Sequence, residues 1–175
     1  MFFEKLKNYN VLLASNSKRR QELLNQLGVE FKIIHQEIDE SFSNVLKSSM
    51  ITDYLAKKKS SILVKNLKKN DLLITSDTIV WHKNIALGKP KNRIEAFKMI
   101  KSLENSYHEV ITSICISTVN FQVIVNEKTL VFFDSIDEND LLYYTKTSDV
   151  LDRAGSYGIQ DYIGHVGIKK IEGSY

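Results

Sequence analysis

The chain has only one cysteine and one proline in 175 residues. A single thiol excludes an internal disulfide and a zinc site built from cysteines alone. Cys115 stands between two isoleucines, which favours a buried thiol over a nucleophile. The only proline, Pro90, follows Gly88-Lys89, and these residues predict a rigid loop.

Long apolar runs and a large net charge are also lacking. No segment is apolar over the length of a signal peptide or a bilayer span, so we expect a cytoplasmic protein without membrane contact. The net charge of +3 is too small to indicate nucleic acid as the main partner. P-loop and dinucleotide-binding glycine motifs are absent, and the four histidines lack the spacing of a zinc site. The length predicts one domain over residues 1–175, with room for two lobes.

Near the N-terminus, the residue pattern predicts a strand, a turn and a helix. Residues 11–14 form a short apolar run, and residues 15–17 are small and polar, as in a turn that caps a helix. Leucines then recur at helical spacing up to Leu27, and Gly28 stands where a helix usually ends.

The first turn of this helix carries three cations, Lys18, Arg19 and Arg20. The helix dipole disfavours each of them by roughly 0.3–1 kcal/mol. Free N–H groups, the Ser15 hydroxyl and two guanidinium groups would together form a phosphate cradle. The alternative is a solvated basic turn, and this stretch alone leaves both open.

Hydrophobic periodicity predicts further helices over residues 51–64 and 92–104, and strands over 30–34, 72–75, 108–119, 121–125 and 130–133. Ser135 and Glu138 have the spacing of a capping box, which predicts a helix that buries Leu141 and Leu142. Residues 153–160 predict a loop that leads into a strand. The two glycines beside its tyrosine indicate a close approach of the backbone to another group.

Isolated charged residues are the candidates for chemistry. Asp77 follows the apolar strand 72–75, where a carboxylate is costly unless it is paired, hydrogen-bonded or bound to metal, and a turn cap is the alternative. Glu40 lies in an acidic loop, and Lys89 in the proline loop. Lys59 belongs to a lysine-rich helix whose cations form a solvated face, with one member free to point inward. Such residues suit a magnesium-bound polyphosphate, but a sugar-phosphate enzyme fits as well.

Five motifs, in order along the chain, match those of one protein family. They are Ser-Asn-Ser-Lys-Arg-Arg-Gln-Glu-Leu-Leu (15–24), Ser-Asp-Thr-Ile-Val (76–80), Gly-Lys-Pro (88–90), His-Glu-Val-Ile-Thr (108–112) and Ala-Gly-Ser-Tyr-Gly-Ile-Gln (154–160). Glu40 and Lys59 also fall at an acidic position and a Leu-Ala-x-x-Lys lysine of that family. The chain therefore resembles the Maf family of nucleoside triphosphate pyrophosphatases. Lys18 replaces the family's proline, Ser76 replaces its alanine, and the family's closing segment is missing after Tyr175.

The resemblance implies an α/β, two-lobed fold like that of the inosine triphosphatases, with a central mixed sheet and an interlobe cleft. It implies hydrolysis of dTTP and UTP to the monophosphate and pyrophosphate, with Mg²⁺ or Mn²⁺ as cofactor and a homodimer as the assembly. The implied residues are Asp77 as catalytic group, Glu40 and Asp77 as metal ligands, and Ser15, Arg19, Arg20, Lys59, Thr78, Lys89 and Gln160 as substrate contacts. The alternatives are a 7-methyl-GTP pyrophosphatase and a non-catalytic regulator of septum formation. An RNA-binding module would need aromatics among its lysines, and these are lacking.

Overall fold

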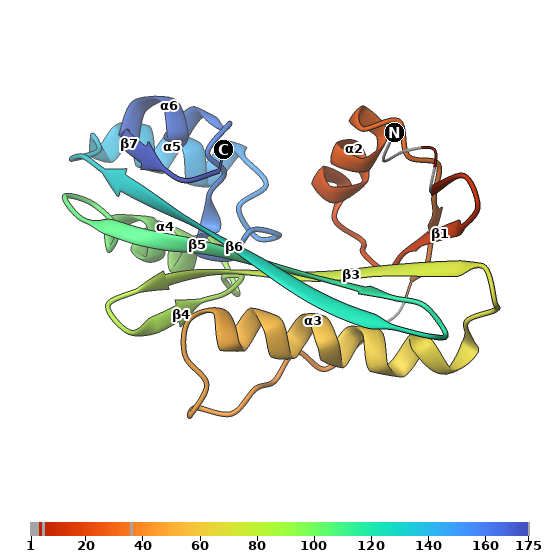
Figure 1. Cartoon of the computed structure of the whole chain (residues 1–175). Helices are drawn as coiled ribbons and strands as arrows, with labels where there is room; N and C mark the ends of the chain where they lie inside the picture. Colours follow the sequence, from red (N-terminus) through yellow and green to blue (C-terminus); the bar gives the residue numbers. More distant parts are fainter. Residues whose placement is uncertain (1–3, 5, 36, 175) are drawn as a thin grey trace. The chain divides into compact units, whose positions relative to one another are not determined.

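The computed structural model describes residue 4 and residues 6–35 and 37–174. Its elements run in the order β1 (Asn10–Leu13), α2 (Lys18–Gln26), β2 (Lys32–Ile33), α3 (Ser49–Leu63), η1 (Val64–Asn66), β3 (Asp71–His82), β4 (Ile85–Leu87), α4 (Arg93–Lys101), β5 (Tyr107–Ser117), β6 (Gln122–Phe133), α5 (Glu138–Thr147), η2 (Ala154–Ser156), α6 (Tyr162–Gly167) and β7 (Ile168–Glu172). Strands and helices are mixed along the chain, as Figure 1 shows, so the expected α/β class is confirmed.

The strands form one mixed sheet in the order β2-β1-β3-β5-β6-β7, with β4 paired to β3. β1 is parallel to both β2 and β3, whereas β4 is antiparallel to β3 and β7 is antiparallel to β6. The first strand–turn–helix unit is therefore placed by a parallel crossover, which requires a helix between its strands.

Two strands are longer than their apolar patterns predict. The expected end of a strand at residues 76–78 is wrong, because β3 continues to His82. Asp77 forms an ion pair and Thr78 bonds Thr112, so neither polar side chain needs a loop to be satisfied. The expected separate strands 121–125 and 130–133 are likewise one strand, β6, whose polar middle includes Lys128, paired with Glu109.

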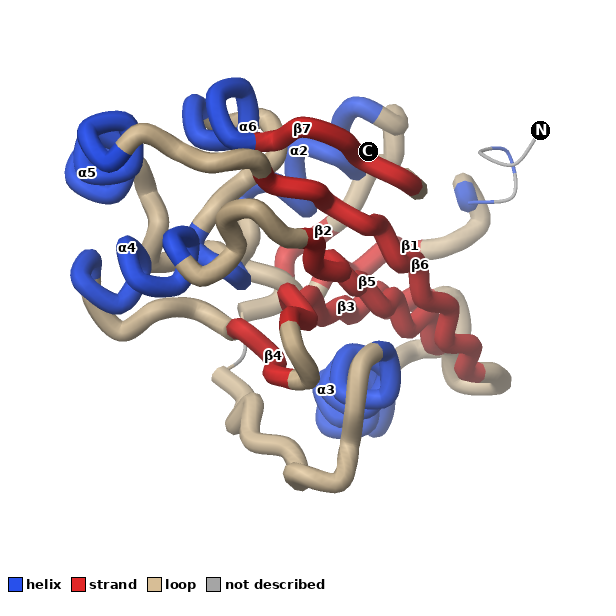
Figure 2. Tube along the Cα trace, turned by 90° about the vertical axis from the view of Figure 1, so that its left-hand side faces the viewer, coloured by secondary structure: helices blue, strands red, loops and turns tan. Residues whose placement is uncertain are grey.

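The chain divides into two compact units, and β3, β5 and β6 each contribute to both. The first unit contains residues 1–77 and 113–126, and the second contains residues 78–112 and 127–175. In the first unit, α2 and α3 lie on opposite sides of β1 and β3 (Figures 1 and 2). The core on the α2 side contains Val11, Val29 and Leu72, against which Leu24 packs.

On the α3 side of the first unit, the contact is unusually polar. The hydroxyls of Ser60 and Ser117 are bonded at 2.7 Å, and the Ser113 hydroxyl donates to Thr52 at 2.6 Å. All four side chains are completely buried. Buried hydroxyls are tolerated where each finds a partner, so these bonds fix α3 against β5. Cys115 is also buried, as predicted.

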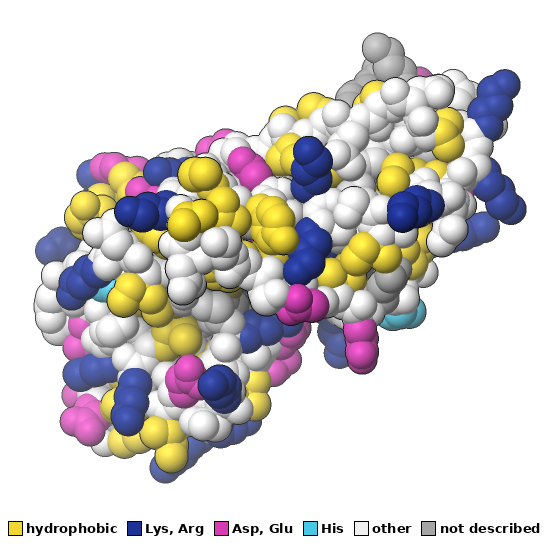
Figure 3. Space-filling view, turned by 90° about the horizontal axis from the view of Figure 1, so that it is seen from below, with side chains coloured by type: hydrophobic (Ala, Val, Ile, Leu, Met, Phe, Trp, Pro, Cys, Tyr) yellow, Lys and Arg dark blue, Asp and Glu magenta, His cyan; other side chains and the backbone are white. Residues whose placement is uncertain are grey.

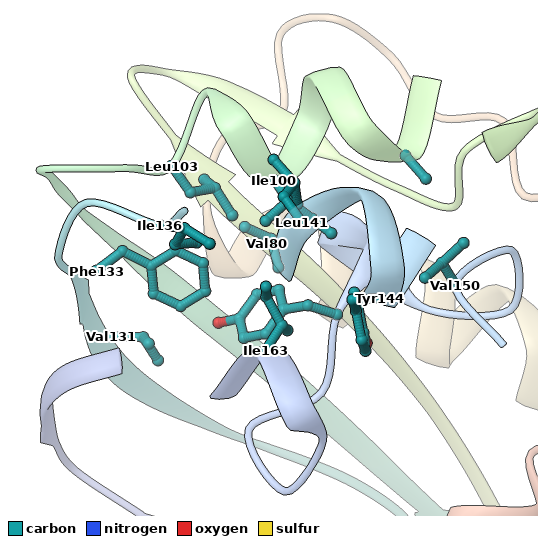
Figure 4. Close-up of a cluster of buried hydrophobic side chains, with 12 residues drawn as sticks. Val80, Ile100, Leu103, Val131, Phe133, Ile136, Leu141, Tyr144, Val150 and Ile163 are labelled. Carbon is teal, nitrogen blue, oxygen red and sulfur yellow. The ribbon is translucent and has the colours of Figure 1, made fainter. Parts of the chain in front are cut away.

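The second unit has the larger apolar core. Figure 4 shows side chains of α4, α5 and α6 directed toward those of β3 and β6, among them Ile100, Leu141, Ile163, Val80 and Phe133. Each of these five is at most 4% exposed. Burial of this kind contributes about 1.5–3 kcal/mol per large side chain, so this core holds the three helices to the strands.

Glycine in the 153–160 segment is required by the same core. Gly155 has φ +69°, and a Cβ at this position would lie 2.5 Å from Cγ2 of Val80. The expected close approach of the backbone is therefore present, and its target is a core strand.

Helix positions follow the periodicity well, and their ends less well. The helices predicted over 51–64 and 92–104 correspond to α3 and α4. The capping box is wrong: Asp137 caps α5 by accepting from the Asn139 N–H, and Leu142 is 37% exposed. The strand expected after residue 160 is also wrong, because the chain forms α6 before β7.

Charges are dispersed on the surface that Figure 3 shows, where basic side chains stand apart among apolar and uncharged ones. A single continuous basic patch, as expected for non-specific nucleic-acid binding, is not seen on this face. Among the residues that the structure describes, no helix is long and apolar enough to span a membrane.

Candidate active site

The turn between β1 and α2 brings Ser15 and Arg20 to the carboxyl end of β1. Ser15 Oγ accepts the Ser17 N–H at 3.2 Å, and Gln21 Nε2 donates to the Ser15 carbonyl at 3.2 Å. Ser17 is the N-cap residue of α2 but makes no side-chain cap bond. Backbone N–H groups at this helix start are therefore not used by a capping side chain, as an anion cradle requires.

Arg20 is the cation of this turn that reaches the sheet. Its Nη1 donates to the carbonyl of Ser76 at 2.9 Å, next to Asp77 in β3. Lys18 and Arg19 are exposed. One of the three predicted cations is thus fixed beside the buried carboxylate, and the other two lie in solvent.

Asp77, Lys59 and Glu40 form the charged centre of the first unit. Lys59 Nζ lies 2.7 Å from Asp77 Oδ1 and 2.7 Å from Glu40 Oε1. The side chains of Lys59 and Asp77 are 13% and 10% exposed, while that of Glu40 is 56% exposed. Of the lysine-rich helix, Lys59 is the member that points inward.

Burial raises the pKa of Asp77 above its ordinary value. The Lys59 ammonium opposes this effect through its charge and its hydrogen bond, Glu40 adds to it, and the charge of Arg20 lowers the pKa of Asp77 again. A carboxylate with a raised pKa is a better proton acceptor than an exposed one, which suits a general base. The alternative in which Asp77 caps a turn is excluded, since it lies inside β3.

The position of Lys59 follows from how α3 is attached. The Thr75 hydroxyl of β3 donates to the carbonyl of Ala56, one turn before Lys59, at 2.7 Å. At the start of α3, Asp53 accepts from the Ser113 hydroxyl at 2.6 Å and from Asn126 Nδ2 at 3.1 Å. These bonds set where along β3 the Lys59 side chain can reach.

Glu40 and Asp77 fit the ligand set of a divalent cation. Two carboxylates that contact the same ammonium lie close enough to approach one metal ion, and oxygen ligands are what Mg²⁺ and Mn²⁺ prefer. Within the described part of the chain, no group of three or more His, Cys, Asp or Glu side chains converges as a metal site. Water and phosphate oxygens would have to complete the coordination, as is usual for Mg²⁺.

The remaining predicted residues belong to the second unit. Lys89 pairs with Asp152, and both side chains are exposed. The Gly155 N–H donates to the Gly88 carbonyl at 3.0 Å, which ties the proline loop to η2. Gln160 is exposed in the turn before α6.

Three partners in this unit were not foreseen from the residue pattern. Asp152 pairs with Lys89, Asp161 accepts from the Tyr144 hydroxyl at 2.7 Å, and His108 Nε2 lies 2.5 Å from the Tyr157 hydroxyl. Burial raises the pKa of Tyr157 and lowers that of His108 to about 3. The only available signal was that Asp152, Tyr157 and Asp161 lie in or beside the glycine-containing motif.

A neighbouring carboxylate differs from Asp77 in its environment. Asp39 is 73% exposed and pairs with Lys58 at 3.3 Å. Hydrogen bonds from Ser41 lower the pKa of Asp39 to about 2. Asp39 is thus an ordinary exposed acid, one position before Glu40.

Comparison with known proteins decides the family. The family model described as Maf-like protein matches residues 10–175. The chain belongs to the Maf family. A dTTP/UTP pyrophosphatase of Christiangramia forsetii is 48% identical over 175 residues, which cover 100% of this chain and 89% of that protein. The dTTP/UTP pyrophosphatase of Flavobacterium johnsoniae is 45% identical over 175 residues, with 100% and 90% covered. The resemblance seen in the five motifs is therefore confirmed.

Solved structures support the same fold. The Staphylococcus aureus Ham1 protein matches this Maf chain with a TM-score of 0.53 at 13% identity, over 90% of both chains. At this identity the similarity shows the fold alone. It confirms the expectation of a mixed α/β architecture of the Maf and Ham1 kind.

Proposed function

We propose that this Maf protein hydrolyses dTTP and UTP to the nucleoside monophosphate and pyrophosphate. The observation that carries the proposal is the buried Asp77 beside Lys59, together with relatives named dTTP/UTP pyrophosphatase over the whole length of the chain. A buried carboxylate held by an ammonium in a strand between two helices has no evident need in a purely structural protein. It fits hydrolysis of a phosphoanhydride.

In this reaction Asp77 takes a proton from the attacking water at its carboxylate oxygen. Its raised pKa makes it a stronger base, and its fixed position in β3 lets it orient the water. Arg20, Lys59 and Ser15, with the α2 N-terminus, bind and orient the phosphate oxygens. Glu40 and Asp77 would hold Mg²⁺ or Mn²⁺, and this cation would supply neutralisation of the phosphate charge.

The second unit is proposed to contribute three further substrate contacts. Lys89 would exchange its exposed pairing with Asp152 for a phosphate, since an exposed ion pair is worth only about 0–1 kcal/mol. Gln160 would read the base, because its amide offers one donor and one acceptor to O4 and N3–H of thymine or uracil. Thr78, bonded to Thr112 at 3.0 Å, and Arg19 complete the proposed contacts. A homodimer and a cytoplasmic location are proposed with them.

The test is a panel of nucleoside triphosphates with Mg²⁺, with the products resolved as pyrophosphate or phosphate. We expect dTTP and UTP to be cleaved to the monophosphate and pyrophosphate faster than CTP, ATP or 7-methyl-GTP. Preference for 7-methyl-GTP would favour the other branch of the family. Binding of nucleotides without turnover would favour a regulator.

The variant Asp77→Asn tests the site itself. It should lose at least 10²–10⁴-fold in turnover, roughly the contribution of a general base, while its circular dichroism spectrum stays that of the wild type. Asp39→Asn is the matched control, because it removes an exposed carboxylate near the same loop. Equal losses in both variants, or more than half of the wild-type turnover in Asp77→Asn, would refute the assignment.

A further inference from the structure

We propose that Lys59 is a displaceable counter-ion that stands between Glu40 and Asp77 in place of a divalent cation. In this view the metal binds tightly only when a triphosphate accepts the Lys59 ammonium. The inference rests on the proposed function, because it assumes that these two carboxylates are metal ligands.

The first support is geometric. One nitrogen, Lys59 Nζ, contacts one oxygen from each carboxylate at 2.7 Å. Those two oxygens therefore already face a common point. Ligands of an octahedral Mg²⁺ lie about 2.0–2.1 Å from the ion. Only a modest closure around that point is needed, and Glu40, which is 56% exposed and outside any helix or strand, is free to make it.

The second support is the charge balance. Asp77 is buried and needs a positive neighbour, which Lys59 provides from the middle of α3. A divalent cation at the same point would face an ammonium that competes for the same oxygens. Two cations cannot both keep these contacts, so metal binding must displace Lys59. A triphosphate offers the displaced ammonium new acceptors, and nucleotide and metal therefore assist each other's binding.

The adjacent lysine provides a comparison on the same helix. Lys58 lies 3.3 Å from Asp39, a single exposed carboxylate, and donates to the Ser41 carbonyl at 3.1 Å. It does not stand between two acids. Removing Lys58 changes the net charge as much as removing Lys59 does, but it opens no place between carboxylates. Any effect specific to Lys59 thus separates displacement from general electrostatics.

The experiment measures Mn²⁺ binding without nucleotide, by electron paramagnetic resonance at pH 8, for wild type, Lys59→Met and Lys58→Met. Lys59→Met should bind Mn²⁺ at least about tenfold more tightly than wild type, and Lys58→Met should stay within about twofold. Circular dichroism melts verify that both variants fold. Unchanged or weaker binding in Lys59→Met, or an equal gain in Lys58→Met, would overturn the proposal.

A second measurement uses wild type and does not depend on a variant that folds. The rate at which an amine-acylating reagent modifies each lysine is followed by mass spectrometry with increasing Mn²⁺. Displacement should raise the rate at Lys59 as the site fills and leave the rate at Lys58 unchanged. A rate at Lys59 that does not respond to saturating Mn²⁺ would overturn the proposal. Neither measurement includes hydrolysis, so failure of the nucleotide panel would refute the function and leave this result to stand or fall alone.

Discussion

His108 makes a pH dependence of stability that can be calculated from its surroundings. Its ring is 1% exposed in β5, with the Phe133 ring edge-on at 5.3 Å and Nε2 at 2.5 Å from the Tyr157 hydroxyl. No hydrogen-bond partner of Nδ1 is found among the described residues. Burial, and to a lesser degree the nearby His82, lowers the pKa of His108 from 6.5 to about 3.

The sign follows from the number of protons bound in each state. Between pH 6.5 and about 3, the unfolded chain binds a proton at His108 and the folded chain does not, so stability falls as pH falls. The neutral ring's contribution is complete above pH 6.5. Each pH unit below it costs about 1.4 kcal/mol, which gives about 2 kcal/mol at pH 5 and, for a chain of this size, roughly 4–8 °C in Tm.

The assay is urea unfolding at pH 8, 7, 6 and 5, compared between wild type and His108→Gln. The variant is less stable throughout because it loses ring contacts, but the difference in free energy of unfolding should shrink by about 2 kcal/mol from pH 8 to pH 5. His165→Gln, at an exposed position in α6, serves as control and should leave the pH dependence unchanged. A difference between wild type and His108→Gln that stays constant across this range would refute the reasoning.

The other predictions concern the site and its supports. Arg20→Ala and Lys89→Ala should each lower kcat/KM for dTTP about ten- to a hundredfold, the worth of a charge-assisted hydrogen bond, and Lys68→Ala should not. Equal losses at all three would indicate a general basic surface. Gln160→Ala should lower kcat/KM for dTTP and UTP by a similar factor and leave ATP nearly unchanged, whereas a uniform drop would mean that it only supports its turn. Asp53→Ala should lower the free energy of unfolding by about 1–3 kcal/mol, because it strands the donors that bind α3 to β5 and β6. An unchanged urea midpoint would contradict this.

Local patterns predicted the elements whose reasons are local. The β1–α2 unit, α3 and α4 depend on apolar spacing and on turn residues near their ends, and all three lie where expected. The errors occur where a polar residue suggested an end. β3 runs through Asp77, and β6 runs through Lys128, because partners from other segments satisfy these side chains within a strand.

By itself, the amino-acid sequence determined the family, the α/β class and the residue types of the site, since ordered motifs and periodicity are properties of the chain. Tertiary structure alone decided which members of each charged group meet. Of three cations in the first turn of α2, Arg20 reaches Ser76, and of the lysines of α3, Lys59 reaches Asp77. These pairs are separated by 56 and 18 positions along the chain. Their contact depends on how β1, β3 and α3 pack, and no local spacing in the sequence encodes that packing.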